Sequence, residues 1–256
     1  MADLRVHMFP CLSDNYGALV HDPDTGLTAA IDAPEADTVR QAVTETGWNL
    51  TDIFVTHHHP DHTQGIGALK KSYGAYVRGP EREVARIEGL DETVAGGTTF
   101  EWAGRELAVI DTPGHTLGQV AYHIPADSLL FAADALFAMG CGRIFEGTPE
   151  MMWQTMQRLM ALPDDTIVYA GHEYTMANAL FAVSVDPSNR RLTERLSEVK
   201  RMRERNEPTL PTTIGLEKAT NPFLRAADPD LRRSIGMENA SDLEVFTEVR
   251  ARKDRA

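Results

Sequence analysis

The sequence has few cysteines and few basic residues, and both shortages limit what the protein can be. Only Cys11 and Cys141 occur among 256 residues, so a disulfide scaffold is excluded and a reducing cytoplasm is the simplest setting. The 25 lysines and arginines face 38 acidic residues, which gives a net charge of -13 at pH 7. We therefore expect no binding to nucleic acid through a general basic surface. An anionic substrate would need a local basic pocket that works against this overall field.

Long apolar runs are also missing from the chain. No stretch approaches the length of a membrane span, and the opening residues 1–15 carry acidic side chains that a signal or transit peptide would lack. We expect a cytoplasmic monomer that has no contact with membrane. Because 42% of its residues are hydrophobic, the chain can bury a full core in one or two domains.

Residues 1–172 alternate short apolar runs with turn signals and short helical patterns. Strands are predicted over Ala18–His21, Thr28–Ile31, Ile53–Thr56, Leu107–Asp111, Gln119–Ile124, Leu129–Ala133 and, as the last strand, Thr166–Ala170. Helices are predicted over Asp37–Thr46, Ile66–Tyr73 and from Thr148 onward, where a capping residue precedes proline and an acid. Strands and helices mixed at this spacing indicate sheets that are covered by helices.

Residues 173–256 show almost no strand pattern. Helices are predicted over Arg190–Asn206, Asp228–Ile235 and Asp242–Arg252. On the last of these, Leu243, Phe246 and Val249 form an apolar face. We therefore expect a mixed domain at residues 1–172 that is followed by a helical domain at residues 173–256.

The most informative stretch is Thr56–His62, which reads Thr-His-His-His-Pro-Asp-His and follows a hydrophobic strand. In extended backbone, side chains two apart point the same way, so His57 and His59 can bind one ion while Asp61 and His62 face a second. Four potential ligands within six residues have no packing rationale, so metal binding is the preferred interpretation. Imidazole nitrogen with carboxylate oxygen suits zinc, iron or manganese.

Three further candidate ligands, His115, Asp134 and His172, each follow an apolar run. Glycines before the two histidines permit tight turns that aim the imidazole. A lone histidine at a strand end is usually a hydrogen-bonded structural residue, so each is weak evidence by itself. The residues that we interpret as structural or surface groups are His7, His21, His58, His123 and the small buried Cys141.

Two metal ions about 3.5–4 Å apart can share a hydroxide and act together on one carbonyl or phosphoryl group. Binding to metal lowers the pKa of water towards neutrality, so hydroxide is present at pH 7. No dedicated general acid stands out, which fits a leaving thiolate with a pKa of about 8.5, although water could also donate a proton. Asp32 ends a predicted strand, where it either orients a ligand histidine or serves as a turn aspartate.

The order of these candidates along residues 4–172 resembles the metallo-β-lactamase superfamily. The resemblance implies an α+β fold, the αββα sandwich whose two halves are ββα-like repeats, followed here by an all-helical domain. It implies two ions, most simply zinc with iron or manganese as alternatives, and it implies Asp61 and Asp134 as catalytic residues. The implied ligands are His57, His59 and His115 for the first ion, Asp61, His62 and His172 for the second, and Asp134 as a bridge between both.

Features outside the metal loop resemble one branch of this superfamily, glyoxalase II or hydroxyacylglutathione hydrolase. They are the Gly140–Thr148 segment, similar to its glutathione-contacting loop, then Gly171–Thr175, Asn221–Arg225 and the terminal Arg250–Asp254. The match spans nearly the whole chain. It implies a thioester hydrolase that converts S-D-lactoylglutathione to D-lactate and glutathione, a step in methylglyoxal detoxification.

The same resemblance implies that acylated glutathione is bound by Arg143, Phe145, Tyr174, Arg250 and Lys253. Some family members carry lysine and tyrosine in place of Arg143 and Phe145, and a phenylalanine cannot offer the hydroxyl. The alternative interpretation of the three cations is plain surface charge. Arg250 and Lys253 lie three apart on a predicted helix and hence on one face, so they can bind one carboxylate only if that helix packs over the metal face.

Other activities fit parts of the pattern. A persulfide dioxygenase shares the fold and a Gly-Cys-Gly-Arg loop but uses a single iron. A lactonase or β-lactamase would not need Arg250 and Lys253, and a non-catalytic binding module predicts lost ligands. All seven ligand candidates are present in this sequence, so the preferred interpretation is a dinuclear thioester hydrolase.

Overall fold

The computed structural model describes residues 2–256, which pack as two compact units. The first unit comprises the chain up to residue 112 together with residues 118–131, and the second comprises residues 113–117 and 132–256. These are units of packing, and the predicted domain boundary between residues 172 and 173 stays a prediction. No helix in residues 2–256 is long and apolar enough to cross a membrane.

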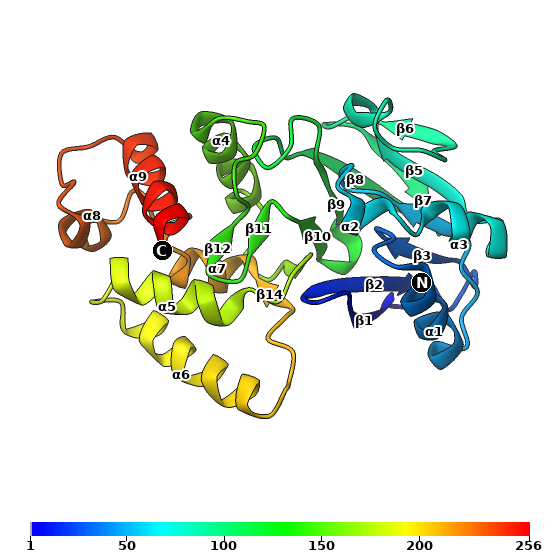
Figure 1. Cartoon of the computed structure of the whole chain (residues 1–256), viewed down its shortest axis with the longest axis horizontal. Coiled ribbons are helices and arrows are strands. Elements are labelled where there is room, and N and C mark those ends of the chain that lie inside the picture. The colour runs from blue at the N-terminus through cyan, green and yellow to red at the C-terminus, as the bar shows by residue number, and fades with distance from the viewer. Residues whose placement is uncertain (1) are drawn as a thin grey trace. The chain divides into compact units, whose positions relative to one another are not determined.

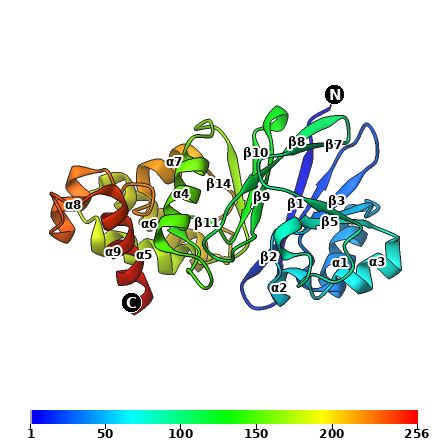
Figure 2. The same ribbon diagram turned by 90° about the horizontal axis from the view of Figure 1, so that it is seen from above.

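The first unit contains a six-stranded sheet that is covered by helices. Its order is β1 (Arg5–Cys11), β2 (Asn15–His21), β3 (Thr28–Ile31), β4 (Asp52–Phe54), β5 (Tyr76–Pro80) and β6 (Glu92–Val94). The first three strands are antiparallel, whereas β3 to β6 run parallel. The parallel crossovers contain α1 (Ala36–Thr46) and α3 (Ile66–Tyr73), which lie side by side (Figure 2). Their apolar faces pack with Leu19, Ile53 and Val77 of the strands in one buried cluster.

A second sheet packs against the first through aromatic side chains. In this unit it consists of β7 (Thr99–Trp102), β8 (Arg105–Asp111), β9 (Val120–Ile124) and the start of β10 (Leu129–Ala133), all antiparallel neighbours. The Phe54 ring of β4 lies 5.6 Å from both the Trp102 and the Tyr122 rings, measured between centroids. The Tyr122 hydroxyl also donates to the Val55 carbonyl at 2.8 Å. The unit is therefore a sandwich of two sheets whose interface contains buried aromatic rings.

The second unit is mostly helical, and its longer segment begins with the end of β10. There Ala133 accepts a hydrogen bond from Gly171, which follows β13 (Ile167–Ala170), and β13 pairs with β14 (Thr212–Thr213). A two-pair hairpin consists of β11 (Leu136–Phe137) and β12 (Gly140–Cys141). The helices are α4 (Pro149–Met160), α5 (Thr175–Val185), α6 (Arg190–Glu204), α7 (Ile214–Thr220), α8 (Pro229–Ile235) and α9 (Asp242–Arg255). Figure 1 shows α5 and α6 packed side by side, and α4 packs with α9.

Most predicted elements are present with small shifts at their ends, including the hairpin of β2 and β3 and the helix after Thr148. The prediction that Thr166–Ala170 is the last strand is wrong, because the two residues of β14 pair with it. Helix α5 was not predicted, because it is apolar on nearly all sides and its hydrophobic residues show no clear helical period. On α9, Val245 is fully buried and Leu243 only partly, so the apolar face is turned slightly from the predicted one.

The buried His123 gives the fold a pH dependence. It lies in β9, opposite Ala108 and Leu130, and burial lowers its pKa below the usual value because a charged ring would lose its hydration. As the pH falls, His123 therefore binds a proton in the unfolded chain at a higher pH than in the folded chain, so the free energy of unfolding decreases below about pH 6.5. We expect the metal-free wild type to lose more free energy of unfolding between about pH 7.5 and about pH 5.5 than His123→Gln does. Urea denaturation measures both losses, and equal losses would contradict the prediction.

Candidate metal centre

The first unit carries four candidate ligands on the segment that follows β4. This strand ends at Phe54, and α2 (Pro60–Thr63) begins at a proline, whose fixed φ suits the first turn of a helix. His57 and His62 are buried, while His59 and Asp61 are partly exposed. A short loop and one helical turn thus place all four side chains at one end of the sheet.

The donor atoms of these residues form two close pairs. His57 Nε2 lies 3.1 Å from His59 Nδ1, and Asp61 Oδ2 lies 3.5 Å from His62 Nε2. Two donors bound to one tetrahedral zinc ion at 2.0–2.2 Å are about 3.4 Å apart. Each pair therefore has the spacing of two ligands on a single ion.

Asp32 fixes the imidazole of His62. Its carboxylate accepts hydrogen bonds from the Thr56 amide at 2.7 Å and the Thr56 hydroxyl at 2.8 Å, and it lies 2.7 Å from His62 Nδ1. In the neutral ring Nδ1 must carry the proton in this bond, so Nε2 presents its lone pair to a metal. Asp32 also has a left-handed φ of 60°, so it makes the turn and orients the ligand at the same time.

Sequence reasoning missed two residues that hold this segment. Glu83 accepts hydrogen bonds from the His58 amide at 2.6 Å and the Gly118 amide at 3.1 Å, and it lies 2.8 Å from His58 Nδ1. Asn15 Nδ2 donates to Asp61 Oδ2 at 3.0 Å. The interpretation of His58 as a structural histidine agrees with this buried pair. Nothing in the sequence around Asn15 or Glu83 indicates these roles, because both residues lie in segments far along the chain from their partners.

The second unit carries the other three candidate ligands, and it brings them together around Asp134. His115 Nε2 and His172 Nε2 each lie 3.4 Å from Asp134 Oδ2. All three residues are at least nine-tenths buried. One carboxylate oxygen thus has ligand spacing to two imidazoles.

Backbone contacts produce this cluster. The Arg143 carbonyl lies 2.8 Å from His115 Nδ1, which again leaves Nε2 with the lone pair, and Gly171 donates to Ala133 next to Asp134. A side chain on Gly142 would place its Cβ 2.0 Å from the Asp134 carbonyl oxygen, so only glycine fits there. The chemistry of the donor set fits a cation, because imidazole lone pairs otherwise face a buried carboxylate.

Comparison with known proteins identifies the family of this chain. Residues 24–172 match the metallo-beta-lactamase superfamily, and residues 173–256 match the hydroxyacylglutathione hydrolase C-terminus. The hydroxyacylglutathione hydrolase of Rhizobium meliloti (strain 1021) is 55% identical to this chain over 254 residues, 99% of each protein. The chain belongs to the hydroxyacylglutathione hydrolase family.

The fold of this chain is also similar to that of several solved structures. ETHE1 from Myxococcus xanthus is 26% identical with a TM-score of 0.68, over 98% of this chain and 90% of that one. A di-iron-bound form of TTHA1623 has a TM-score of 0.62 at 21% identity, over 85% of this chain and 98% of that one. The predicted fold class, a metallo-β-lactamase domain with a C-terminal helical domain, is confirmed.

The predicted glutathione-binding cations of the family lie in the second unit, on α9 and the loop after β12. Asp254 connects two of them, because it accepts a hydrogen bond from Arg250 at 2.8 Å and lies 3.7 Å from Arg143 Nε. Arg250 is buried and donates to the Cys141 carbonyl at 3.0 Å. Lys253 donates to the Ala177 carbonyl at 3.2 Å, and burial, followed by the Arg250 charge, lowers its pKa below the usual value.

The two predicted aromatic residues flank candidate ligands. Tyr174 stacks on the His172 ring at 4.7 Å between centroids, with 5° between the planes, and 37% of it is exposed. Phe145 lies 5.2 Å from the His115 ring and is 60% exposed. Arg143 lies over the Phe145 ring at 5.9 Å. Two of the five predicted substrate residues, Phe145 and Tyr174, thus lie against the rings of candidate ligands.

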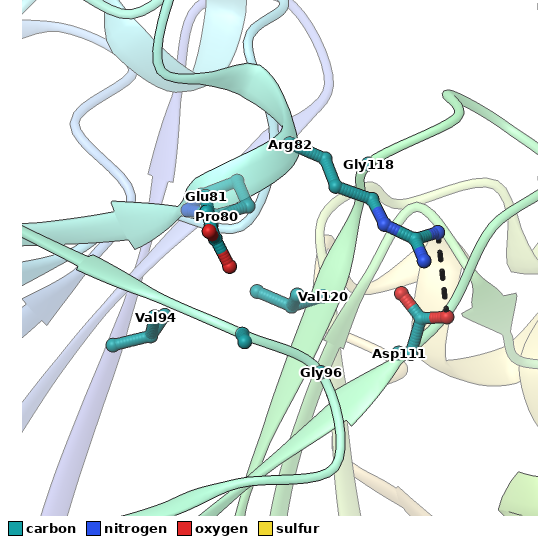
Figure 3. Close-up of a pocket in the computed structure, with 9 residues that line it drawn as sticks. Pro80, Glu81, Arg82, Val94, Gly96, Asp111, Gly118 and Val120 are labelled. Carbon is teal, nitrogen blue, oxygen red and sulfur yellow. Dashed lines mark ion pairs between the residues drawn. The ribbon is translucent and has the colours of Figure 1, made fainter.

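A separate cavity of about 140 Å³ lies in the first unit, next to the short helix η1 (Glu81–Glu83). Figure 3 shows Arg82 and Asp111 across it, with 3.8 Å between their charged atoms. Its lining includes Gly118 and Val120 but none of the seven candidate ligands. It is not the candidate metal centre.

Asp32 is the residue whose loss tests the ligand geometry of the first unit. Residues that orient a metal-binding histidine typically contribute tenfold to a hundredfold in metal affinity, so we expect about that loss in Asp32→Asn. Asp52→Asn is the matched control, because Asp52 is also a buried aspartate of this sheet but pairs with Arg78 at 2.9 Å and Trp102 at 3.1 Å. Zinc competition against a chelator measures both affinities. Equal affinities in the two variants would rule out an orienting role for Asp32.

Proposed function

We propose that the protein hydrolyses the thioester of S-(2-hydroxyacyl)glutathione, with S-D-lactoylglutathione as the substrate that yields D-lactate and glutathione in methylglyoxal detoxification. Membership of the hydroxyacylglutathione hydrolase family over nearly the full chain supports this activity. The structural observation that best supports the proposal is the position of Asp134, because one of its carboxylate oxygens lies 3.4 Å from two imidazole nitrogens. A carboxylate placed in this way is suited to two ions rather than one.

The proposed centre assigns seven ligands to two ions. His57, His59 and His115 would hold the first ion, Asp61, His62 and His172 would hold the second, and Asp134 would contribute to both. Each ion would then have four protein donors, of which one close pair belongs to the first unit. The bound divalent metal, zinc or alternatively iron or manganese, supplies a Lewis acid and lowers the pKa of water to near neutrality.

The chain's own residues prepare this chemistry. Asp32 and the Arg143 carbonyl accept from Nδ1 of His62 and His115, so Nε2 of these two histidines need not lose a proton before it binds. Asp61 and Asp134 are the proposed catalytic carboxylates. A free thiol of the cysteine type has a pKa of about 8.5, so the glutathione thiolate can leave without a strong acid from the protein.

We propose that residues 1–172 form the metal-binding domain and residues 173–256 the glutathione-binding domain of a cytoplasmic monomer that binds no nucleic acid. The net charge of -13 and the two free cysteines support this setting. Burial raises the thiol pKa of Cys11 to about 12 and that of Cys141 to about 11, so neither thiol forms a reactive thiolate at neutral pH.

Turnover and metal content together test the proposed function. The purified protein should hydrolyse S-D-lactoylglutathione, which is measured as a loss of thioester absorbance. Elemental analysis should find two metal ions per chain. Asp134→Ala should lose metal and most turnover, because both ions lose a ligand. Asp165→Ala, an exposed aspartate of the same unit, is the control and should keep both. Oxygen uptake with glutathione persulfide, or a single ion at saturation, would refute the proposal in favour of a dioxygenase.

Lys253 and Arg143 test glutathione recognition. A hydrogen bond to a charged group contributes about 1.5–3 kcal/mol, so Lys253→Ala and Arg143→Ala should each raise KM about tenfold to a hundredfold. The value of kcat should be mostly kept, because these groups lie away from the reacting carbonyl. Arg252→Ala is the matched control on α9, since Arg252 pairs with Glu248 at 2.8 Å. A KM equal to that of the control in both variants would leave Lys253 and Arg143 without a part in glutathione recognition.

A further inference from the structure

The Asn221–Arg225 segment matches the family but has no role in the proposed chemistry, and its first residue makes unusual contacts. Asn221 ends α7 and is fully buried. Its Oδ1 accepts from the Phe223 amide at 3.0 Å, which turns its NH2 group towards the hairpin of β11 and β12. There Nδ2 donates to the Gly140 carbonyl at 2.9 Å and the Phe137 carbonyl at 3.3 Å. One side chain thus joins both strands of the hairpin.

Glu217, one turn earlier on α7, supports Asn221 and contacts the same hairpin. Its Oε2 accepts from the Met139 amide at 2.7 Å and from Asn221 at 3.0 Å. Its Oε1 accepts from Arg195 at 2.7 Å and from Thr212 at 2.7 Å. The buried carboxylate therefore has a cationic partner and four hydrogen bonds, which is the condition for a stable buried charge.

Two further carbonyls of the hairpin segment accept hydrogen bonds from other helices of the second unit. Asn178 of α5 donates to the Ala138 carbonyl at 3.2 Å, and Arg250 of α9 donates to the Cys141 carbonyl at 3.0 Å. The hairpin itself has only two residue pairs, and such a short ribbon is not stable alone. Its buried backbone needs these partners, because no ladder supplies them.

The hairpin connects Asp134 to Arg143, the proposed shared metal ligand and a proposed glutathione contact. We propose that Asn221 is a positioning residue, which clasps the hairpin and thereby sets the place of both Asp134 and Arg143. This inference rests on the proposed function for the roles of those two residues. It gives the helices a part in building the metal centre as well as in binding the substrate.

The test compares Asn221→Ala with Asn189→Ala. Asn189 lies in the same unit and is also an amide with several bonds: it caps α6 and donates to Asp186 at 2.9 Å and to Ala219 at 3.0 Å, but it does not contact the hairpin. In Asn221→Ala we expect about tenfold faster amide hydrogen exchange over residues 136–142, about tenfold faster zinc loss to a chelator, and a raised KM for lactoylglutathione. In Asn189→Ala the exchange rate, the rate of zinc loss and the KM should all stay near their wild-type values, even if its Tm falls as much as that of Asn221→Ala.

Two outcomes overturn the proposal. The first is an amide exchange rate over residues 136–142 of Asn221→Ala that stays within twofold of the rate in Asn189→Ala, and the second is a rate of zinc loss that stays within twofold of the rate in this control. If Asn221→Ala does not fold, Asn178→Ala removes one hydrogen bond from the same hairpin and should speed both exchange and zinc loss, and unchanged rates there overturn the proposal equally. The exchange and zinc measurements need no substrate. A wild type that leaves lactoylglutathione intact would therefore refute the proposed function without deciding the role of Asn221.

Discussion

A buried carboxylate next to two imidazole rings is the constraint on which the rest of this structure depends. Asp134 is only 6% exposed, and its Oδ2 lies 3.4 Å from His115 and from His172. A buried anion in contact with neutral rings is costly unless a cation joins it, so the arrangement favours metal binding. The surrounding chain must hold it in this geometry before any ion arrives, because metal affinity depends on prearranged donors.

Both units use the same means to prepare their histidines. An oxygen acceptor at Nδ1, the Asp32 carboxylate for His62 and the Arg143 carbonyl for His115, fixes the proton and directs Nε2 towards the metal. In each case the acceptor belongs to a segment that has a second function. Asp32 makes the turn that ends β3, and Arg143 belongs to the loop that is proposed to bind glutathione. The backbone of Arg143 thus orients a candidate ligand while its side chain is proposed to bind the substrate.

The helices of the second unit supply hydrogen-bond partners for buried backbone groups. The chain between Asp134 and Arg143 is buried but forms only a two-pair hairpin, so its amides and carbonyls depend on side chains from α5, α7 and α9. Arg250 is one of these, which explains why it is 6% exposed although it was predicted as a substrate contact. Its guanidinium holds the loop that carries Arg143, and the two arginines share Asp254.

The sequence by itself determined the mixed fold with a helical end and most strands and helices of residues 1–172, and it predicted the donor set, because these depend on local spacing and period. The packed Thr56–His62 stretch indicates metal chemistry without any tertiary information. Only the tertiary structure decided which groups hold the ligands in place. Glu83, Asn15 and Asn221 act across 25 to 84 residues of chain, and such contacts leave no periodic trace in the sequence. The pairing of β14 with β13 escaped for the same reason, since two residues have no period and their hydrogen-bond partners are set by the fold alone.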